Sequence, residues 1–549
     1  MVDVDPVMRS PAMVADLPRW GLSERTHQTR NYTQLCLRMH LTPGLVLALQ
    51  LSVGWAASVS VQTTSGLVTG SQTNGLSTFK GIRFGQAPTG SLRWEPPVAF
   101  TSTASQNATS FGPACVQQFP FAVAAINGQL FNTPPPAESE DCLFLNVWAP
   151  TSTTATAVVI WLYGGALTFG TASTPTYDGA SLAASQNITV VSINYRTNVF
   201  GFPNSPDLPT AGNNLGFLDQ GPCQLAFQWV QQNIAKFGGD PKKVTIMGQS
   251  AGGRSVASQY ASYTPGTAPF RAAIMISGSA EARSPTPNFN SFNNMATALG
   301  CTQDPGVARL TCLKAVSASA IHTYTNGPSS GTWTVTVFTD PIQRVRDNKA
   351  AGVPFMLGTA ENDGSLFALG QTNLTAYVAG TFGTAVTADQ VRALYPSGLS
   401  DNAVIADLVR DFTFLCPHQL WSAAAVGAGQ PNVYRYSYGA VFANMQVFPN
   451  AGAWHSSDLF EIFGTYNRTN ATPAEATLSS TMQTIYGNFI RDPTSPPAPN
   501  WPRYVPGNTT TTLAKLAYNG NVALGNVAMT VRSSLNDAPC DALWDKFLG

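Results

Sequence analysis

The pentapeptide GQSAG at residues 248–252 constrains this chain more than any other segment. It follows a short apolar run at residues 244–247 and precedes a stretch whose composition suits a helix. A strand, a tight turn and a helix in that order hold a serine on a strained elbow. Gly248 and Gly252 would let the strand and the helix approach closely, leaving Ser250 exposed at the helix N-terminus. The pattern predicts that Ser250 is a nucleophile, and a plain structural turn is the alternative.

A serine nucleophile needs a base, usually a histidine, and a carboxylate that orients the base. The histidines are His27, His40, His322, His418 and His455. The first two lie in an amino-terminal segment that we expect to be absent from the mature protein. In chains with a serine elbow, the acid follows the serine and the histidine follows the acid. This order excludes His322 if the acid lies near residue 360. His418 precedes an apolar run, which favours packing, whereas His455 follows turn-rich residues and suits a catalytic loop. His455 is therefore the candidate base.

The candidate acid should lie between Ser250 and His455, after a strand. Residues 353–358 are apolar and predict a buried strand, and the polar segment TAENDG follows. It contains two carboxylates, Glu361 and Asp363. The residues alone leave the choice between them open.

Further motifs occur along most of the chain. They are FKGIRFGQAP (residues 79–88), SLRWEPP (91–97), SEDCLFLNVWAP (139–150), VVIWLYGGALTFG, SINYRTNVFGF, NNLGFLDQ, WVQQNIAKFGGDP and GQSAGG. In this order they resemble the type-B carboxylesterases, a family of fungal esterases and lipases, cholinesterases and non-catalytic neuroligins. Alternating apolar strands and helical runs predict an α/β fold, and the resemblance implies the α/β-hydrolase fold. That fold has a large, mostly parallel central sheet with helices on both faces, and its site lies at the carboxyl ends of the strands.

The resemblance also implies roles for particular residues. The family's acid is the glutamate of Asp-Glu-Gly, and Asp363 takes its place here, with Glu361 kept as a minority candidate. Aspartate is one methylene shorter, so its loop must approach the histidine more closely. Oxyanion-hole N–H groups are implied at Gly165 and Ala166, where the family has glycines, and at Ala251 after the nucleophile. Each such donor typically stabilises a transition state by about 3 kcal/mol.

The eight cysteines show no CxxC spacing that would indicate a metal site. The resemblance implies three disulfides, Cys115 with Cys142, Cys301 with Cys312, and Cys416 with Cys540. The third would close a long loop around His455 and stabilise the fold by up to roughly 5 kcal/mol. Cys223 is expected to be a buried free thiol. The resemblance further implies two structural ion pairs, Arg93 with Glu140 and Arg196 with Asp219.

The amino terminus suggests export. Residues 1–38 are polar and match no family motif, so we interpret them as a leader that comes from an over-extended gene model. Residues 39–57 are largely apolar and predict a signal peptide, followed by a single domain at residues 59–549 and a secreted, extracellular protein. Sequons for glycosylation lie at Asn107, Asn187, Asn373, Asn467, Asn470 and Asn508.

Charged residues make up only 11% of the chain and the net charge is zero, which argues against nucleic acid as a partner. The sequence therefore predicts a serine hydrolase that cleaves carboxylic esters without cofactor or metal. The alternative is a lipase acting on triacylglycerol or sterol esters through transient contact with a lipid interface. The apolar loop between Cys115 and Cys142 fits a mobile lid or a fixed wall equally well. Gln249 stands where cholinesterases have a glutamate, which disfavours a cationic substrate, and the oligomeric state stays open.

Overall fold

The computed structural model describes most of residues 56–548. The described ranges omit residues 120–123, 222–224, 281–287, 329–330, 332, 334, 336–339, 431, 508–509, 521 and 523–527. The predicted leader and nearly all of the predicted signal peptide lie outside the described residues, as do Cys223 and the sequon at Asn508. Those assignments, and the domain boundaries drawn from them, stay predictions.

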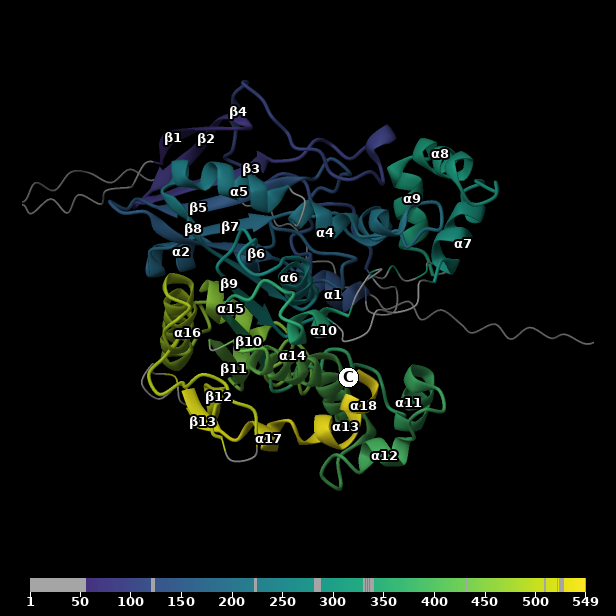
Figure 1. Ribbon diagram of the computed structural model, residues 1–549, viewed down its shortest axis with the longest axis vertical. Coiled ribbons are helices and arrows are strands. Elements are labelled where there is room, and N and C mark those ends of the chain that lie inside the picture. Colours follow the sequence, from purple (N-terminus) through teal and green to yellow (C-terminus); the bar gives the residue numbers. More distant parts are fainter. Residues whose placement is uncertain are drawn as a thin grey trace, which may run out of the picture. The chain divides into compact units, whose positions relative to one another are not determined.

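The described strands form one 13-stranded sheet in the order β1-β2-β3-β5-β7-β6-β8-β9-β10-β11-β12-β13, with β4 beside β2 (Figure 1). The strands are β1 Ala57–Thr63, β2 Gly66–Thr73, β3 Leu76–Arg83, β4 Gln106–Asn107, β5 Phe144–Pro150, β6 Thr156–Leu162, β7 Thr189–Ile193, β8 Gly239–Gln249, β9 Ala272–Ile276, β10 Phe355–Ala360, β11 Val433–Tyr438, β12 Leu513–Leu516 and β13 Ala528–Val531. Neighbours from β7 to β12 are parallel, and the strands at both edges are antiparallel. The predicted mostly parallel sheet is confirmed.

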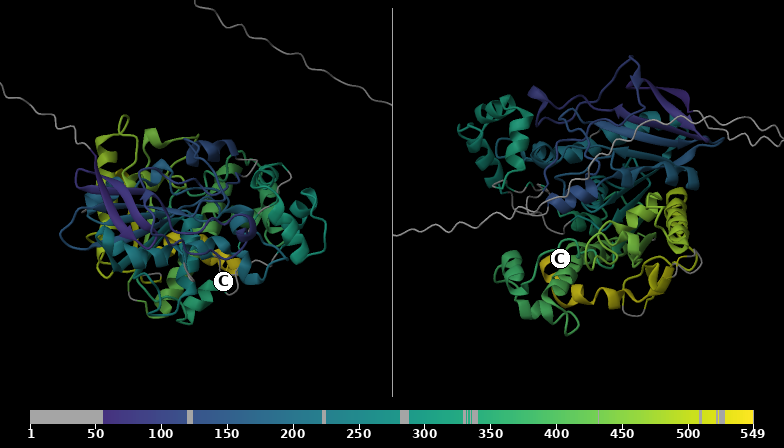
Figure 2. Two further views of the ribbon diagram at one scale, coloured as in Figure 1. Left: turned by 90° about the horizontal axis from the view of Figure 1, so that it is seen from above. Right: turned by 180° about the vertical axis from the view of Figure 1, so that it is seen from behind.

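Helices cover both faces of this sheet. Those packed on it include α2 Ala180–Gln186, α5 Ala226–Asn233, α6 Ala251–Ser262, α10 Pro341–Arg346, α14 Cys416–Gly427, α15 Ser457–Phe463 and α16 Pro473–Arg491. The long α16 packs against β6 and β8. It is the long yellow-green helix in the view from behind (Figure 2). The remaining helices are α1 Ala124–Phe131, α3 Asn198–Gly201, α4 Leu215–Gln220, α7 Asn290–Ala298, α8 Val307–Ala315, α9 Ala318–Thr325, α11 Leu374–Phe382, α12 Ala388–Arg392, α13 Asp401–Val409, α17 Ser533–Asn536 and α18 Asp545–Leu548.

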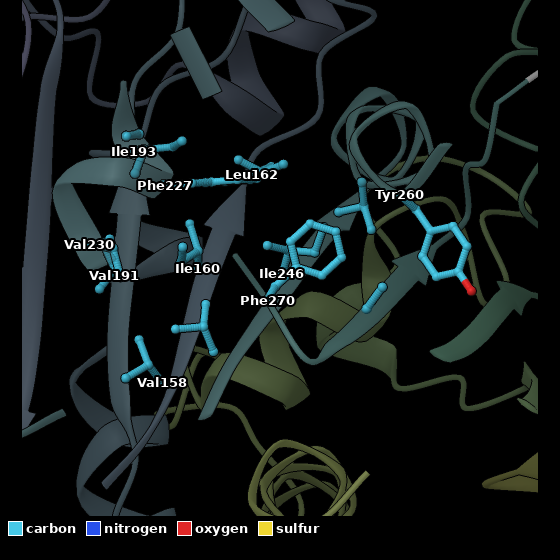
Figure 3. Packing of buried hydrophobic residues seen from close by; sticks show 14 of the residues in the cluster. Val158, Ile160, Leu162, Val191, Ile193, Phe227, Val230, Ile246, Tyr260 and Phe270 are labelled. Atoms are coloured by element: carbon cyan, nitrogen blue, oxygen red, sulfur yellow. The ribbon is translucent and has the colours of Figure 1, made fainter. Parts of the chain in front are cut away.

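The central strands are apolar on both sides because helices bury both faces of a parallel sheet. In β6 every residue is buried, and successive side chains point to opposite faces. Val158, Ile160 and Leu162 face the layer that contains α5 and α6, as the close view of this core shows (Figure 3). Val159 and Trp161 face the layer that contains α2 and α16. This two-sided packing fixes the carboxyl ends of the strands, where the site lies.

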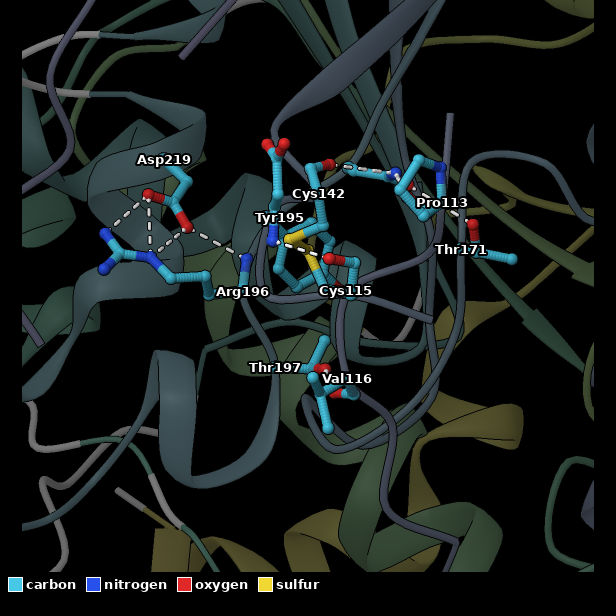
Figure 4. The surroundings of a disulfide bond; sticks show 12 residues. Pro113, Cys115, Val116, Cys142, Thr171, Tyr195, Arg196, Thr197 and Asp219 are labelled. Atoms are coloured by element: carbon cyan, nitrogen blue, oxygen red, sulfur yellow. Dashed lines mark hydrogen bonds and ion pairs between the residues drawn. A yellow bond between two sulfur atoms is a disulfide. The ribbon is translucent and has the colours of Figure 1, made fainter. Parts of the chain in front are cut away.

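Covalent and ionic links hold the loops at that edge. The structure contains the three disulfides Cys115–Cys142, Cys301–Cys312 and Cys416–Cys540. Near the first of them the Arg196 guanidinium forms a buried ion pair with Asp219, with a shortest distance of 2.7 Å (Figure 4). Arg93 pairs with Glu140 at 2.6 Å. Within the described residues, no helix combines the length and the apolar character needed to cross a membrane.

Candidate active site

Ser250 stands at the turn between β8 and α6. Its backbone has φ 56° and ψ −125°, a strained combination for a residue other than glycine. A Cβ on Gly248 would lie 2.3 Å from the carbonyl oxygen of Gly252, and one on Gly252 would lie 2.0 Å from that of Leu162. The expectation that these glycines permit close approach of strand and helix is confirmed. The turn presents Ser250 at the N-terminus of α6.

The structure brings His455 and Asp363 together. The imidazole Nδ1 lies 2.9 Å from Asp363 Oδ1, and both side chains are buried. The other carboxylate oxygen accepts hydrogen bonds from the backbone N–H of Ala360 at 2.7 Å and from the hydroxyl of Ser277 at 2.8 Å. An ionised carboxylate only accepts hydrogen bonds, so this set of donors suits the charged form of Asp363. In a neutral imidazole that donates to this carboxylate, the proton is on Nδ1 and the lone pair is on Nε2.

The competing acid and bases lie in other environments. Glu361 accepts hydrogen bonds from the hydroxyl of Ser437 at 2.9 Å and from the ammonium of Lys515 at 3.2 Å. His418 is buried and accepts a hydrogen bond at Nε2 from the backbone N–H of Gly278 at 3.3 Å. Burial lowers the pKa of His418 to about 3, so it stays neutral and fits the packing role expected for it. His322 lies near Glu138, with Nε2 3.6 Å from its carboxylate.

Several contacts to the candidate base were missed by sequence reasoning. The Gln249 side-chain Nε2 lies 3.0 Å from Nε2 of His455. The Phe414 ring stacks on the imidazole with centroids 4.7 Å apart, and Phe367 meets it edge-on at 5.0 Å. The position of Gln249 directly before the nucleophile was an available signal. Ser277, directly after β9, was another, because neighbouring parallel strands end at the same edge. Nothing in the sequence pointed to the two phenylalanines.

The loop after β6 presents free N–H groups near Ser250. Gly165 and Ala166 have φ values of 106° and 54°, and no described residue accepts a hydrogen bond from either N–H group. A Cβ on Gly165 would lie 2.3 Å from the carbonyl oxygen of Phe169, so only glycine fits there. Ala251 is the first residue of α6, where the N–H has no partner within the helix. Each of the three N–H groups can donate a hydrogen bond to a bound molecule.

Two further buried carboxyls follow the candidate base in α15. Burial raises the pKa of Asp458 to about 8, and the negative charge of Asp363 adds to the shift. Burial also raises the pKa of Glu461 to about 8, with a contribution from Glu475. Both groups are therefore mostly protonated at neutral pH. Asp363 is the carboxyl group that contacts His455 directly.

Two cavities meet at Ser250, and Ala166 and Phe367 also line both of them. One has a volume of about 350 Å³ and is walled by Ile126 and Phe131 of α1. The other has a volume of about 570 Å³, and its further walls include Phe412, Phe414, Phe547 and Leu548. A cavity of about 150 Å³ holds one benzene ring, so these cavities have room for roughly two and four rings. No cluster of histidine, cysteine and carboxylate side chains suited to a metal ion occurs among the described residues.

Comparison with known proteins agrees with this geometry. The model of the carboxylesterase family matches residues 57–542. The chain is 30% identical to secreted lipase 1 of Botryotinia fuckeliana over 518 residues, covering 82% of this chain and 88% of that protein. It is 30% identical to para-nitrobenzyl esterase of Bacillus subtilis over 473 residues, covering 81% and 92%.

A solved structure of a PNB esterase superposes with a TM-score of 0.70 at 25% identity, covering 88% of this chain and 99% of that one. The superposition confirms the predicted α/β-hydrolase fold. The family match and the relatives identify the activity as hydrolysis of carboxylic esters. A serine elbow, a buried imidazole paired with a carboxylate, and a match along most of the sequence thus lead to one conclusion: the chain belongs to the carboxylesterase family.

Proposed function

We propose that this protein is a secreted serine esterase in which Ser250, His455 and Asp363 carry out the reaction. The observation that carries this proposal is the hydrogen bond between His455 Nδ1 and Asp363 Oδ1, next to a strained serine elbow. Asp363 orients the imidazole so that Nε2 is the ring nitrogen that acts as the base. Ser250 lines the same cavity as His455.

The reaction follows from these positions. The Ser250 hydroxyl oxygen attacks the ester carbonyl carbon while its proton passes to His455 Nε2, and the carbonyl oxygen takes the negative charge. The N–H groups of Gly165, Ala166 and Ala251 stabilise that oxygen. Collapse of the intermediate breaks the bond to the alcohol oxygen, which takes the proton from Nε2 and leaves. Water, deprotonated by His455, then attacks the acyl-enzyme and releases the acid and Ser250.

The cavities favour esters with apolar groups on both sides of the ester bond. Ser250 contacts both spaces, and phenylalanine side chains line each of them. Neither cavity is matched to a group as small as acetyl, because an acetyl group would leave apolar walls in contact with water. The second candidate is a lipase that acts at a lipid interface. The names of fungal relatives, such as secreted lipase 1, and the apolar side chains of α1 at the smaller cavity support it.

Hydrolysis of nitrophenyl esters with two to eighteen acyl carbons tests the proposal, with Ser250→Ala as the control. We expect activity that rises with chain length beyond acetate and that disappears in Ser250→Ala. A fluorophosphonate probe should label the peptide that contains Ser250, as read by mass spectrometry. Activity retained by Ser250→Ala, or labelling at another residue, would refute the assignment. A rate that jumps above the solubility limit of the long esters would favour the lipase.

Secretion has its own test. The relatives named secreted lipases and the apolar segment at residues 39–57 support it. Amino-terminal sequencing of the protein from culture medium should give a start close to residue 58. A secreted product that retains Met1 would contradict both the signal peptide and the gene-model hypothesis.

A further inference from the structure

Gln249 engages the ring nitrogen of His455 that the proposed reaction requires. The two side-chain nitrogens, Nε2 of Gln249 and Nε2 of His455, lie 3.0 Å apart. The other ring nitrogen donates its proton to Asp363, so Nε2 of a neutral imidazole can only accept. The amide therefore donates an N–H to this lone pair. No described residue forms a hydrogen bond with the Ser250 hydroxyl in the same structure.

Gln249 is held firmly in this position. It is the last residue of β8, where it pairs with Ile276 of β9, and only 2% of it is exposed. Gly164 lies against it, because a Cβ there would be 2.8 Å from the Gln249 carbonyl oxygen and 3.0 Å from its side-chain Oε1. The amide is thus packed between the loop after β6 and the imidazole.

We propose that Gln249 is a positioning residue that keeps His455 neutral and correctly oriented as a base, so that the enzyme stays active at mildly acidic pH. This inference rests on the proposed function. An N–H donor aimed at Nε2 favours the neutral imidazole, because protonation of Nε2 breaks the bond and places two donors opposite each other. When Nε2 takes the Ser250 proton, the amide must turn its oxygen toward the ring or give way.

Other titratable groups near His455 form a fixed background. Asp363 contacts Nδ1, and Asp458 of α15, whose pKa burial raises to about 8, is mostly protonated at neutral pH. Arg410 and Asp411, in the π-helical segment that also carries Phe414, pair with each other at 2.7 Å. Tyr377 of α11 lines the smaller cavity and Arg254 of α6 lines the larger one. Since none of these groups is altered by a substitution at residue 249, comparison between variants isolates the amide.

The substitution Gln249→Glu places a carboxylate where the amide now donates. A carboxylate accepts a hydrogen bond from protonated Nε2 and stabilises the imidazolium. The expected shift is roughly one to two pH units upward in the His455 titration midpoint, the size of a charge-assisted hydrogen bond. Gln249→Met keeps the volume and removes the donor, so its midpoint should rise less. Asn127→Asp adds a carboxylate to the same cavity without this bond and should shift the midpoint less than Gln249→Glu does.

NMR of ¹⁵N-histidine-labelled protein measures the midpoint directly, with His455→Gln to assign the signal. The acid limb of kcat/KM should move with it. An unchanged midpoint in a folded Gln249→Glu protein, or an equal shift in Asn127→Asp, would overturn the proposal. If the Gln249→Glu protein does not fold, the Gln249→Met protein takes its place. A His455 titration midpoint in Gln249→Met no higher than in the wild type would then overturn the proposal. Because the NMR signal reports the resting imidazole, this result is independent of whether Ser250 is the nucleophile, which fluorophosphonate labelling decides.

Discussion

Asn362 is joined to Ala453 by two hydrogen bonds of 3.0 Å, one from its N–H to the Ala453 carbonyl and one from the Ala453 N–H to its side-chain oxygen. Asn362 directly precedes Asp363, and Ala453 lies two positions before His455. The acid loop and the base loop are therefore fastened to each other beside the side chains that they carry. Gly452 completes the contact, because a Cβ there would lie 2.2 Å from the Asn362 oxygen.

Asn362→Ala should loosen this junction. We expect a loss of about 1 kcal/mol of stability from the missing hydrogen bond. We expect a fall of roughly tenfold or more in kcat, because small displacements of catalytic groups are costly. Asn488→Ala is the matched control, since Asn488 donates to the carbonyl of Pro497 in another part of the fold. Thermal unfolding and ester hydrolysis separate the two effects, and equal losses of kcat in both variants would contradict the role given to Asn362.

The two proposed N–H donors after β6 should differ in how much kcat changes on substitution. Gly165→Ala forces a Cβ against the Phe169 carbonyl and should reduce kcat by at least a hundredfold. Ala166→Gly removes a strain of about 1–2 kcal/mol at φ 54°, but adds about 0.5–1 kcal/mol of unfolded-chain entropy. The expected net change is within about 1.5 kcal/mol, with kcat largely kept. Steady-state kinetics check both variants. A Gly165→Ala protein that keeps the kcat of the wild type would refute the assignment of Gly165 to the oxyanion hole.

Phe367 lines both cavities and is 43% exposed, so its side chain forms part of the wall of each. Phe367→Ala should join the two spaces and raise the ratio of kcat/KM for branched or long acyl groups over acetate. Val505→Ala removes another exposed apolar side chain away from the cavities and should leave the ratio unchanged. A panel of nitrophenyl esters measures both ratios. An unchanged ratio in Phe367→Ala would show that other walls set the acyl preference.

Asp458 should make stability depend on pH. Its pKa is raised from 3.8 to about 8, so between these values the folded protein binds a proton that the unfolded chain releases. Stability therefore falls as pH rises through this window, by at most about 1.4 kcal/mol per pH unit from this group. Asp458→Asn should flatten the decline in Tm between pH 5 and pH 8, whereas Asp389→Asn at an exposed site should not. A decline as steep in Asp458→Asn as in the wild type would contradict the buried, protonated state.

The sequence predicted those parts of the molecule that local pattern controls. The order of strand, turn and helix around Ser250 follows from glycines and apolar residues that are adjacent in the chain. The sheet follows from the apolar strands, which must be covered on both faces. The residues alone left the choice between Asp363 and Glu361 open, and the resemblance of the acid loop to a known family favoured Asp363; the structure adds the different surroundings of Glu361. These surroundings depend on Lys515 and Ser437, which lie far along the chain and draw Glu361 to them.

Contacts between loops were beyond prediction for the same reason. From the sequence, only the missing charge of Gln249 was considered. Its contact with His455 arises because the loop that carries His455 lies beside the end of β8. The stacking of Phe414 on the imidazole depends on a π-helical segment at Arg410–Leu415 whose side-chain direction no local pattern specifies. The two cavities likewise belong to no single segment of sequence.

The meeting of two unequal cavities at Ser250 has a consequence for chirality. In the proposed reaction the N–H groups of Gly165, Ala166 and Ala251 bind the carbonyl oxygen of the ester, so this oxygen has one direction in which to point. The acyl and alcohol parts then enter different spaces, and an ester of a secondary alcohol presents its substituents to walls that are not mirror images. Of two enantiomers, we expect one to react faster, with the hand of the preferred alcohol set by the protein's own asymmetry.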